Sequence, residues 1–343
     1  MSNRSPLSLL LILAFAACSR SNNPAPAPPP VPPIHPTDTT HPVASNDSLY
    51  WQAVSLPIAA GGGFSDIWFT DTLHGIAAGA DGYIYTSSDG GSNWIKTTLV
   101  QPGNSQPGLE TLFFLTPSQG YVIGGNSFAV TTNGGLNWTI KARPDHVGIW
   151  PNFQFLSPST GYLATGSALY KTIDTGTNWT VVKKDSASAL FFTNINTGSI
   201  FSYPGKISNT TDGGNTWQPM ANLPASSPTR NFCFLQYSDA QHGWFMDLYR
   251  LSISGNGGAT WQTVFQPNSS DPLLDLQLLS GQSAYITTSH HLYKTIDGGA
   301  TWQQEYTLPS TPPSYNSISA LFFTDDHHGW ACCSNGVVLR YRH

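Results

Sequence analysis

The chain has 343 residues, of which only 10% are charged, against about 25% in an average soluble protein. Its formal net charge is −5, and only 14 residues are Lys or Arg. Proteins that bind nucleic acids or anionic lipid surfaces need clustered basic side chains. The composition therefore excludes nucleic acid as a partner and a cationic face as a means of membrane contact.

The N-terminus has the features of a lipoprotein signal peptide. A positive residue, Arg4, precedes an apolar run over residues 7–15 that is too short to span a bilayer. The run ends in Phe-Ala-Ala-Cys, which resembles a lipobox. We expect cleavage after residue 17, a lipid on Cys18 and, because Ser19 replaces the Asp of inner-membrane retention, export to the outer membrane. The alternative is an ordinary secretory signal, which also exports the protein.

Residues 18–46 form a proline-rich segment, with nine prolines between Pro24 and Pro42. Such a sequence favours extended polyproline II and buries too little apolar surface to fold. We interpret it as a disordered tether. One folded domain is expected over residues 47–343.

Six segments of that domain share the pattern Ser/Thr-x-Asp/Asn-x-Gly-x-x-Trp, and their tryptophans recur every 38 to 44 residues. That period is typical of a four-stranded propeller blade, and the pattern resembles the Asp-box, or BNR, repeat. In it the Asp or Asn side chain binds backbone amides, glycine adopts a positive φ, and we expect the tryptophan to be buried beneath the turn. The predicted structural residues are Asp89, Trp94, Asn133, Trp138, Asp174, Trp179, Asp212, Trp217, Asn256, Trp261, Asp297 and Trp302.

A seventh copy, over residues 321–340, ends without an Asp-box or a fourth strand. Residues 50–56 near the N-terminus match the strands that follow the boxes, such as residues 302–308. The sequence thus predicts an all-β fold: a seven-bladed β-propeller whose N-terminal strand completes the last blade. Closure of the ring removes exposed sheet edges, so we expect a monomer.

The lipobox, the repeats and the seven blades together resemble the photosystem II stability and assembly factor family of BNR propellers, over residues 49–343. The resemblance implies a non-enzymatic assembly role. The blades have few arginines where that family has a basic patch: Arg143, Arg230, Arg250, Arg340 and Arg342. We expect a cell-envelope binding or scaffold protein without a cofactor, whose partner is an envelope protein or a glycan; an accessory subunit without a small ligand is a further possibility.

Asp-boxes also occur in glycosidases, so an enzyme is the alternative. A sialidase is excluded by the lack of its arginine motif and by the presence of only two glutamates. A polysaccharide hydrolase needs only two facing carboxylates. Aligning the inner strands places Asp66 and Asp275 at one level of the channel, as weak catalytic candidates. The competing interpretation is that they cap strands or bind water. The aligned residues are Asp66, Thr111, Asn152, Ala189, Asp275 and Ala320.

The longer loops between blades carry aromatic and polar residues that suit a protein or carbohydrate ligand at a concave surface. Local packing of these side chains is the alternative. The candidate ligand-binding residues are Arg143, His146, Trp150, Arg230 and Tyr315.

Neither the cysteines nor the histidines predict a metal site. Cys233, Cys332 and Cys333 lack the spacing of zinc ligands, and we expect them to be buried free thiols. The histidines near the second strands of three repeats lie in different blades, which favours loop packing. They are His74, His242, His327 and His328. The adjacent pair His290 and His291 would point to opposite faces of a strand.

Overall fold

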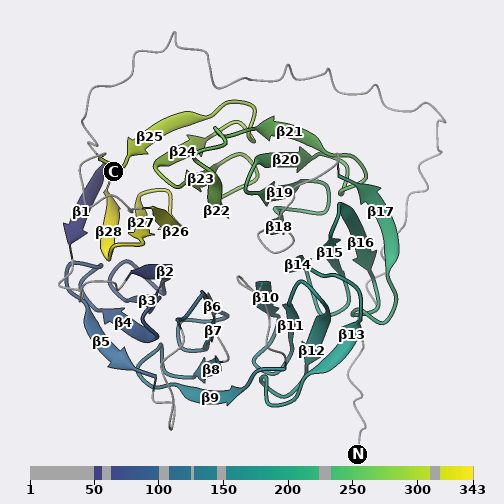
Figure 1. Cartoon of the computed structure of the whole chain (residues 1–343), viewed down its shortest axis with the longest axis horizontal. Coiled ribbons are helices and arrows are strands. Elements are labelled where there is room, and N and C mark those ends of the chain that lie inside the picture. The colour runs from purple at the N-terminus through teal and green to yellow at the C-terminus, as the bar shows by residue number, and fades with distance from the viewer. Residues whose placement is uncertain are drawn as a thin grey trace, which may run out of the picture. The chain divides into compact units, whose positions relative to one another are not determined.

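The computed structural model describes residues 50–55, 63–99, 108–124, 127–144, 152–223, 233–309 and 317–342. All of them lie within the unit Pro33–His343. The described residues form 28 strands and no helix, so this part of the chain contains no helix that could cross a membrane. The strands make seven four-stranded antiparallel sheets, which are arranged as a ring of blades around a central axis (Figure 1). The predicted seven-bladed propeller is confirmed.

Each of the first three blades is a meander of consecutive strands, with the first strand nearest the axis and the fourth at the rim (Figure 1). Blade 1 comprises β2 (Phe64–Phe69), β3 (Gly75–Gly79), β4 (Tyr83–Ser87) and β5 (Ile95–Thr98). Blade 2 comprises β6 (Thr111–Phe114), β7 (Gly120–Gly124), β8 (Ser127–Thr131) and β9 (Thr139–Ala142). Blade 3 comprises β10 (Asn152–Phe155), β11 (Gly161–Ala164), β12 (Leu169–Thr172) and β13 (Thr180–Lys183).

Blades 4 to 6 repeat this order. Blade 4 comprises β14 (Ala189–Phe192), β15 (Gly198–Ser202), β16 (Lys206–Thr210) and β17 (Gln218–Asn222). Blade 5 comprises β18 (Cys233–Tyr237), β19 (Gly243–Asp247), β20 (Arg250–Ser254) and β21 (Gln262–Phe265). Blade 6 comprises β22 (Leu273–Leu278), β23 (Ala284–Thr288), β24 (His291–Thr295) and β25 (Gln303–Thr307).

Blade 7 joins the two ends of the domain. It comprises β26 (Ile318–Asp325), β27 (His328–Cys333), β28 (Val337–Arg342) and the N-terminal strand β1 (Trp51–Ser55). Strand β1 pairs antiparallel with β28, with Trp51 opposite Tyr341. The prediction that an N-terminal strand completes the last blade is confirmed.

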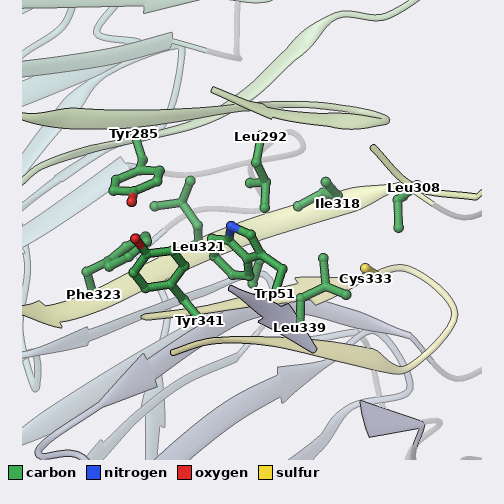
Figure 2. Close-up of a cluster of buried hydrophobic side chains, with 11 residues drawn as sticks. Trp51, Tyr285, Leu292, Leu308, Ile318, Leu321, Phe323, Cys333, Leu339 and Tyr341 are labelled. Carbon is green, nitrogen blue, oxygen red and sulfur yellow. The ribbon is translucent and has the colours of Figure 1, made fainter. Parts of the chain in front are cut away.

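Aromatic packing replaces the missing Asp-box of blade 7. The indole of Trp51 lies 5.2 Å from the ring of Tyr341 and 5.9 Å from that of Phe323, measured between centroids. Tyr285 of blade 6 stacks on Phe323 at 4.1 Å, so the cluster spans two blades (Figure 2). Because Trp51 is only 3% exposed, β1 is held by apolar burial as well as by its backbone pairing.

The antiparallel meander gives the ring two different faces. Hairpins between the first and second strands of a blade lie at the same end as those between the third and fourth strands. The Asp-boxes occupy the latter hairpins, so we name this end the Asp-box face. Backbone hydrogen bonds connect the two kinds of hairpin, as from Gly213 N to Asn196 O at 2.8 Å. The loops that connect successive blades lie on the opposite face.

Candidate functional site

The innermost strands of the seven blades surround the axis, and equivalent positions on them form two levels. At the first level the residues lie opposite a residue near the end of the second strand: Asp66, Thr111, Asn152, Ala189, Asp275 and Ala320, as predicted. Blade 5, which sequence alignment left unplaced, contributes Phe234. The second level lies two residues further along each strand and is half-buried throughout: Trp68, Phe113, Gln154, Phe191, Gln236, Gln277 and Phe322.

The two candidate aspartates bind the backbone of adjacent blades. Asp66 Oδ2 accepts a hydrogen bond from Leu112 N of blade 2 at 2.7 Å, and its Oδ1 accepts one from Ile67 N at 2.8 Å. Asp275 repeats this arrangement with Leu321 N of blade 7 and Leu276 N, both at 2.8 Å. Each carboxyl group therefore connects the starts of two inner strands, which is the capping role weighed above.

The environment of these aspartates favours their neutral form. Desolvation is the largest effect and raises the pKa of Asp66 to about 8, with a further increase from the charge of Asp275. Desolvation likewise raises the pKa of Asp275 to about 6. Backbone hydrogen bonds oppose both increases. At neutral pH the two groups thus differ in protonation, as an acid and base pair would, but all four of their oxygens contact backbone amides.

Of the predicted ligand-binding residues, the structure describes only Arg143, which is half-buried just after β9. His146, Trp150, Arg230 and Tyr315 lie outside the described residues, and their role stays a prediction. The same holds for Cys18 and the tether.

The Asp-boxes have the predicted hydrogen bonds. In blade 4, Asp212 Oδ1 accepts from Thr216 N at 2.9 Å and from the Thr210 hydroxyl at 2.8 Å. The Thr210 hydroxyl in turn accepts from Gly214 N at 2.9 Å. The hydrogen bond from the Thr216 hydroxyl contributes most to holding the pKa of Asp212 at about 2. Equivalent bonds to the box carboxylate or amide occur at Asp89, Asn133, Asp174, Asn256 and Asp297.

The prediction that the box tryptophans are buried was wrong, because all six are half-buried. Their rings contact core phenylalanines edge-on, as Trp217 contacts Phe192 with centroids 6.3 Å apart. The indole N–H donates to the second glycine of the same turn, as from Trp217 to Gly214 O at 3.0 Å, so each ring stays at the rim of its turn. Trp302 is an exception, since its Nε1 makes no hydrogen bond within the described residues.

An exposed Asp-x-x-His-Gly loop recurs on the Asp-box face of three blades. His74 Nδ1 lies 2.8 Å from Asp71 Oδ2, and His328 Nδ1 lies 2.8 Å from Asp325 Oδ1. The third pair is Asp239 with His242, at 2.7 Å. Sequence reasoning noticed the histidines and expected loop packing, but it missed the aspartate three residues earlier that pairs with each of them.

The other histidine pair, His290 and His291, lies on the opposite face, where both rings contact the same aspartate. Their Nδ1 atoms are 3.0 and 2.6 Å from Asp271 oxygens, and these hydrogen bonds lower the pKa of Asp271 to about 2 against the opposing effect of burial. Within the described ranges, no group of three or more His, Cys, Asp or Glu residues could hold a metal ion.

The three cysteines of the described domain are free and buried, as expected. Burial raises the pKa of Cys333 to about 12 and that of Cys233 still further. Their thiols are therefore neutral and unreactive at physiological pH.

Comparisons with known proteins agree with this fold. The structure titled "YCF48 bound to D1 peptide" is 23% identical, covers 85% of this chain and 97% of its own, and has a TM-score of 0.65. YCF48 from Cyanidioschyzon merolae is 20% identical over 85% of this chain and 99% of that one, with a TM-score of 0.64. The GH74 xyloglucanase from Xanthomonas campestris is 14% identical, over 85% and 54%, with a TM-score of 0.59.

A comparison with curated proteins gives no match. The model of one protein family, however, matches residues 43–342, which include the whole described part of the chain. This match covers the Asp-boxes of all six complete repeats and the closing strand β1. The chain belongs to the family described as photosynthesis system II assembly factor YCF48.

Proposed function

We propose that the protein is a non-catalytic binding propeller of the bacterial cell envelope, which holds a protein partner during assembly or in a complex. The observation that carries this proposal is the use of Asp66 and Asp275 as connectors between blades. Each carboxyl group accepts a backbone N–H at both oxygens, and one of these N–H groups belongs to the inner strand of the next blade, so a substrate that displaced it would break a contact between inner strands.

Membership of the YCF48 family supports a protein as the partner. One solved relative is described as bound to a D1 peptide. Peptide binding by this chain is a proposal on that basis, and the partner here is an envelope protein rather than a photosystem subunit, given the predicted lipobox and the few arginines of the blades.

The lipid anchor is part of the same proposal, and it rests on the sequence Phe-Ala-Ala-Cys at residues 15–18. The anchor is tested by expressing the full-length protein and its Cys18→Ser variant in a Gram-negative host fed an alkyne fatty acid. The wild type should take up the label and sediment with outer membranes, while the variant takes up none. Equal distribution of both proteins in the soluble fraction would contradict the anchor.

The predicted binding residues Trp150 and Tyr315 can be tested by affinity capture from detergent-solubilised envelope. Tagged mature protein is compared with the double variant Trp150→Ala and Tyr315→Ala, which alters no Asp-box. We expect the wild type to capture a defined partner, and this partner, when tagged, to capture the wild type. The double variant should retain less of the partner. If no partner is captured, the binding proposal fails.

A glycoside hydrolase is the second candidate function, and one observation favours it: two aspartates at one level of the inner strands have pKa values raised to about 8 and about 6. Screening plant and bacterial polysaccharides for release of reducing sugar tests this candidate. Hydrolysis by the wild type that disappears in Asp275→Asn would establish it in place of the non-catalytic function.

A further inference from the structure

A cavity of about 320 Å³ opens at the Asp-box face, beside the ends of three inner strands. These strands are β14, β18 and β22, from blades 4, 5 and 6. The lining comes from these strands and the hairpin that follows β22: Phe191, Gln236, Tyr237, Ser238, Leu278, Leu279, Ser280 and Gly281. Its size is at the lower end of the range of about 300–1,000 Å³ that is usual for ligand sites.

Glutamines at the second level of the inner strands recognise extended backbone in two other places. Gln154 Oε1 accepts from Phe192 N at 2.8 Å, and its Nε2 donates to Phe192 O at 3.0 Å. Gln277 makes the same pair of bonds with Phe323, at 2.7 and 2.9 Å. In both cases one carboxamide binds the N–H and the C=O of a single residue in the next blade.

Gln236 occupies the same position of blade 5 but has no such partner. It lies opposite Trp244 in the sheet, as Gln154 lies opposite Tyr162 and Gln277 opposite Tyr285. Within the described part of the chain its carboxamide makes no hydrogen bond, and the side chain instead lines the cavity. A half-buried carboxamide thus keeps one donor and one acceptor available side by side.

The rest of the lining is uncharged. The rings of Phe191 and Tyr237 lie 5.9 Å apart between centroids, and the half-buried side chains of Leu278 and Leu279 lie beside them. The polar contribution comes from the hydroxyls of Ser238 and Ser280. Burying a charged side chain without a partner is costly, so the lining favours an uncharged side chain in the ligand.

We propose that this cavity binds an extended peptide segment of the partner protein, with Gln236 on the backbone of one residue and an uncharged side chain of that segment against Phe191 and Leu278. The carboxamide accepts from the peptide N–H and donates to the peptide C=O, as Gln154 and Gln277 do within the propeller. This inference rests on the proposed function, because it assumes that the partner is a protein, and it adds a site on the Asp-box face.

Selection of a random heptapeptide phage library on the immobilised mature protein tests the site. We expect enriched peptides to share an uncharged core, and synthetic copies to bind Gln236→Ala at least tenfold more weakly than wild type, by titration calorimetry. Gln236→Glu retains the size but not the donor, so it should weaken binding similarly. The matched control is Gln241→Ala, an exposed glutamine of the same blade and face, which should bind as wild type.

Since the Gln236 carboxamide makes no bond to the propeller, both variants should keep the wild-type melting temperature. Enriched peptides with charged cores, or peptides that bind Gln236→Ala unchanged, overturn the site. If the envelope partner is captured equally by wild type and Gln236→Ala, the proposed function stands and this site is wrong. If binding that depends on Gln236 is found only with oligosaccharides on a glycan array, the peptide assignment is overturned.

Discussion

The indole Nε1 of Trp330 donates a hydrogen bond to the carbonyl oxygen of Gly90 at 3.0 Å, across 240 positions of the sequence. The bond joins blade 7, which lacks an Asp-box, to the Asp-box of blade 1. The indole also stacks on Phe69 of blade 1, with centroids 3.6 Å apart. Tyr162 makes the equivalent contact between blades 3 and 4, to Gly213 O at 2.9 Å. Ring closure therefore uses the same kind of interblade contact as the interface between blades 3 and 4.

Trp330→Phe should lower the free energy of unfolding by about 1 kcal/mol, because it removes this hydrogen bond and keeps an aromatic ring on Phe69. Urea denaturation followed by circular dichroism measures the loss. Tyr162→Phe removes the corresponding bond in an interface formed by consecutive repeats. It should lower the free energy of unfolding by about the same amount. A much larger loss in Trp330→Phe alone would mean that the closing interface is held differently from the others.

The Asp-box depends on the hydroxyl of its first residue. Thr210→Val keeps the shape of the side chain but leaves Gly214 N and Asp212 without this partner, so we expect a loss of about 2 kcal/mol. Thr210→Ser should lie within about 0.5 kcal/mol of wild type, because blades 1 and 5 already use Ser87 and Ser254 in this role. Equal stability of the Val and Ser variants in thermal melts would contradict the role of the hydroxyl.

One Asp-box carries backbone strain. Thr175 has a φ of 61°, where the equivalent residues of the other boxes are glycines, such as Gly134 at 70°. A β-branched residue is disfavoured in this region, so Thr175→Gly should stabilise the protein by about 1 kcal/mol despite the greater freedom of glycine in the unfolded chain.

The reciprocal change, Gly134→Thr, is the matched control for Thr175→Gly. It should destabilise the protein by a similar amount, because a Cβ there would meet only the Pro117 carbonyl oxygen, at 3.2 Å, and the strain would come from the backbone. Differential scanning calorimetry should thus show melting temperatures that move in opposite directions. A shift of both in the same direction would contradict the strain at Thr175.

Asp66 should make stability fall as pH rises. Its pKa is raised from 3.8 to about 8 in the folded protein, so between these values the folded state binds more protons than the unfolded state. The slope from one such group has an upper limit of about 1.4 kcal/mol per pH unit. Asp66→Asn, which cannot titrate, should flatten the decline in urea midpoint up to pH 8.

Asp275→Asn provides the comparison, because a pKa of about 6 confines its effect to the lower part of the range. Above pH 6 this variant should still lose stability, but the decline should end at a lower pH than in wild type, because the charge of Asp275 no longer raises the pKa of Asp66. Parallel stability curves for wild type and Asp66→Asn would show that this carboxyl group is not neutral in the folded protein.

The sequence by itself determined the fold and the structural repeat. The hydrogen bonds of an Asp-box join residues within a few positions of one another, such as Thr172, Asp174 and Gly176, so a short pattern specifies them. The period of the tryptophans specified four strands per blade. The likeness of residues 50–56 to the strands after the boxes specified how the ring closes.

Only the tertiary structure decided what the inner strands do, because their side chains act across the boundary between two sheets. Asp66 binds Leu112 and Asp275 binds Leu321, each 46 positions away, and sequence alone left capping and catalysis as alternatives. Gln154, Gln236 and Gln277 are the same residue at the same position, yet Gln236 lines a cavity while the other two bind the backbone of the next blade. The difference depends on how each pair of neighbouring blades packs, and no local sequence pattern encodes that packing.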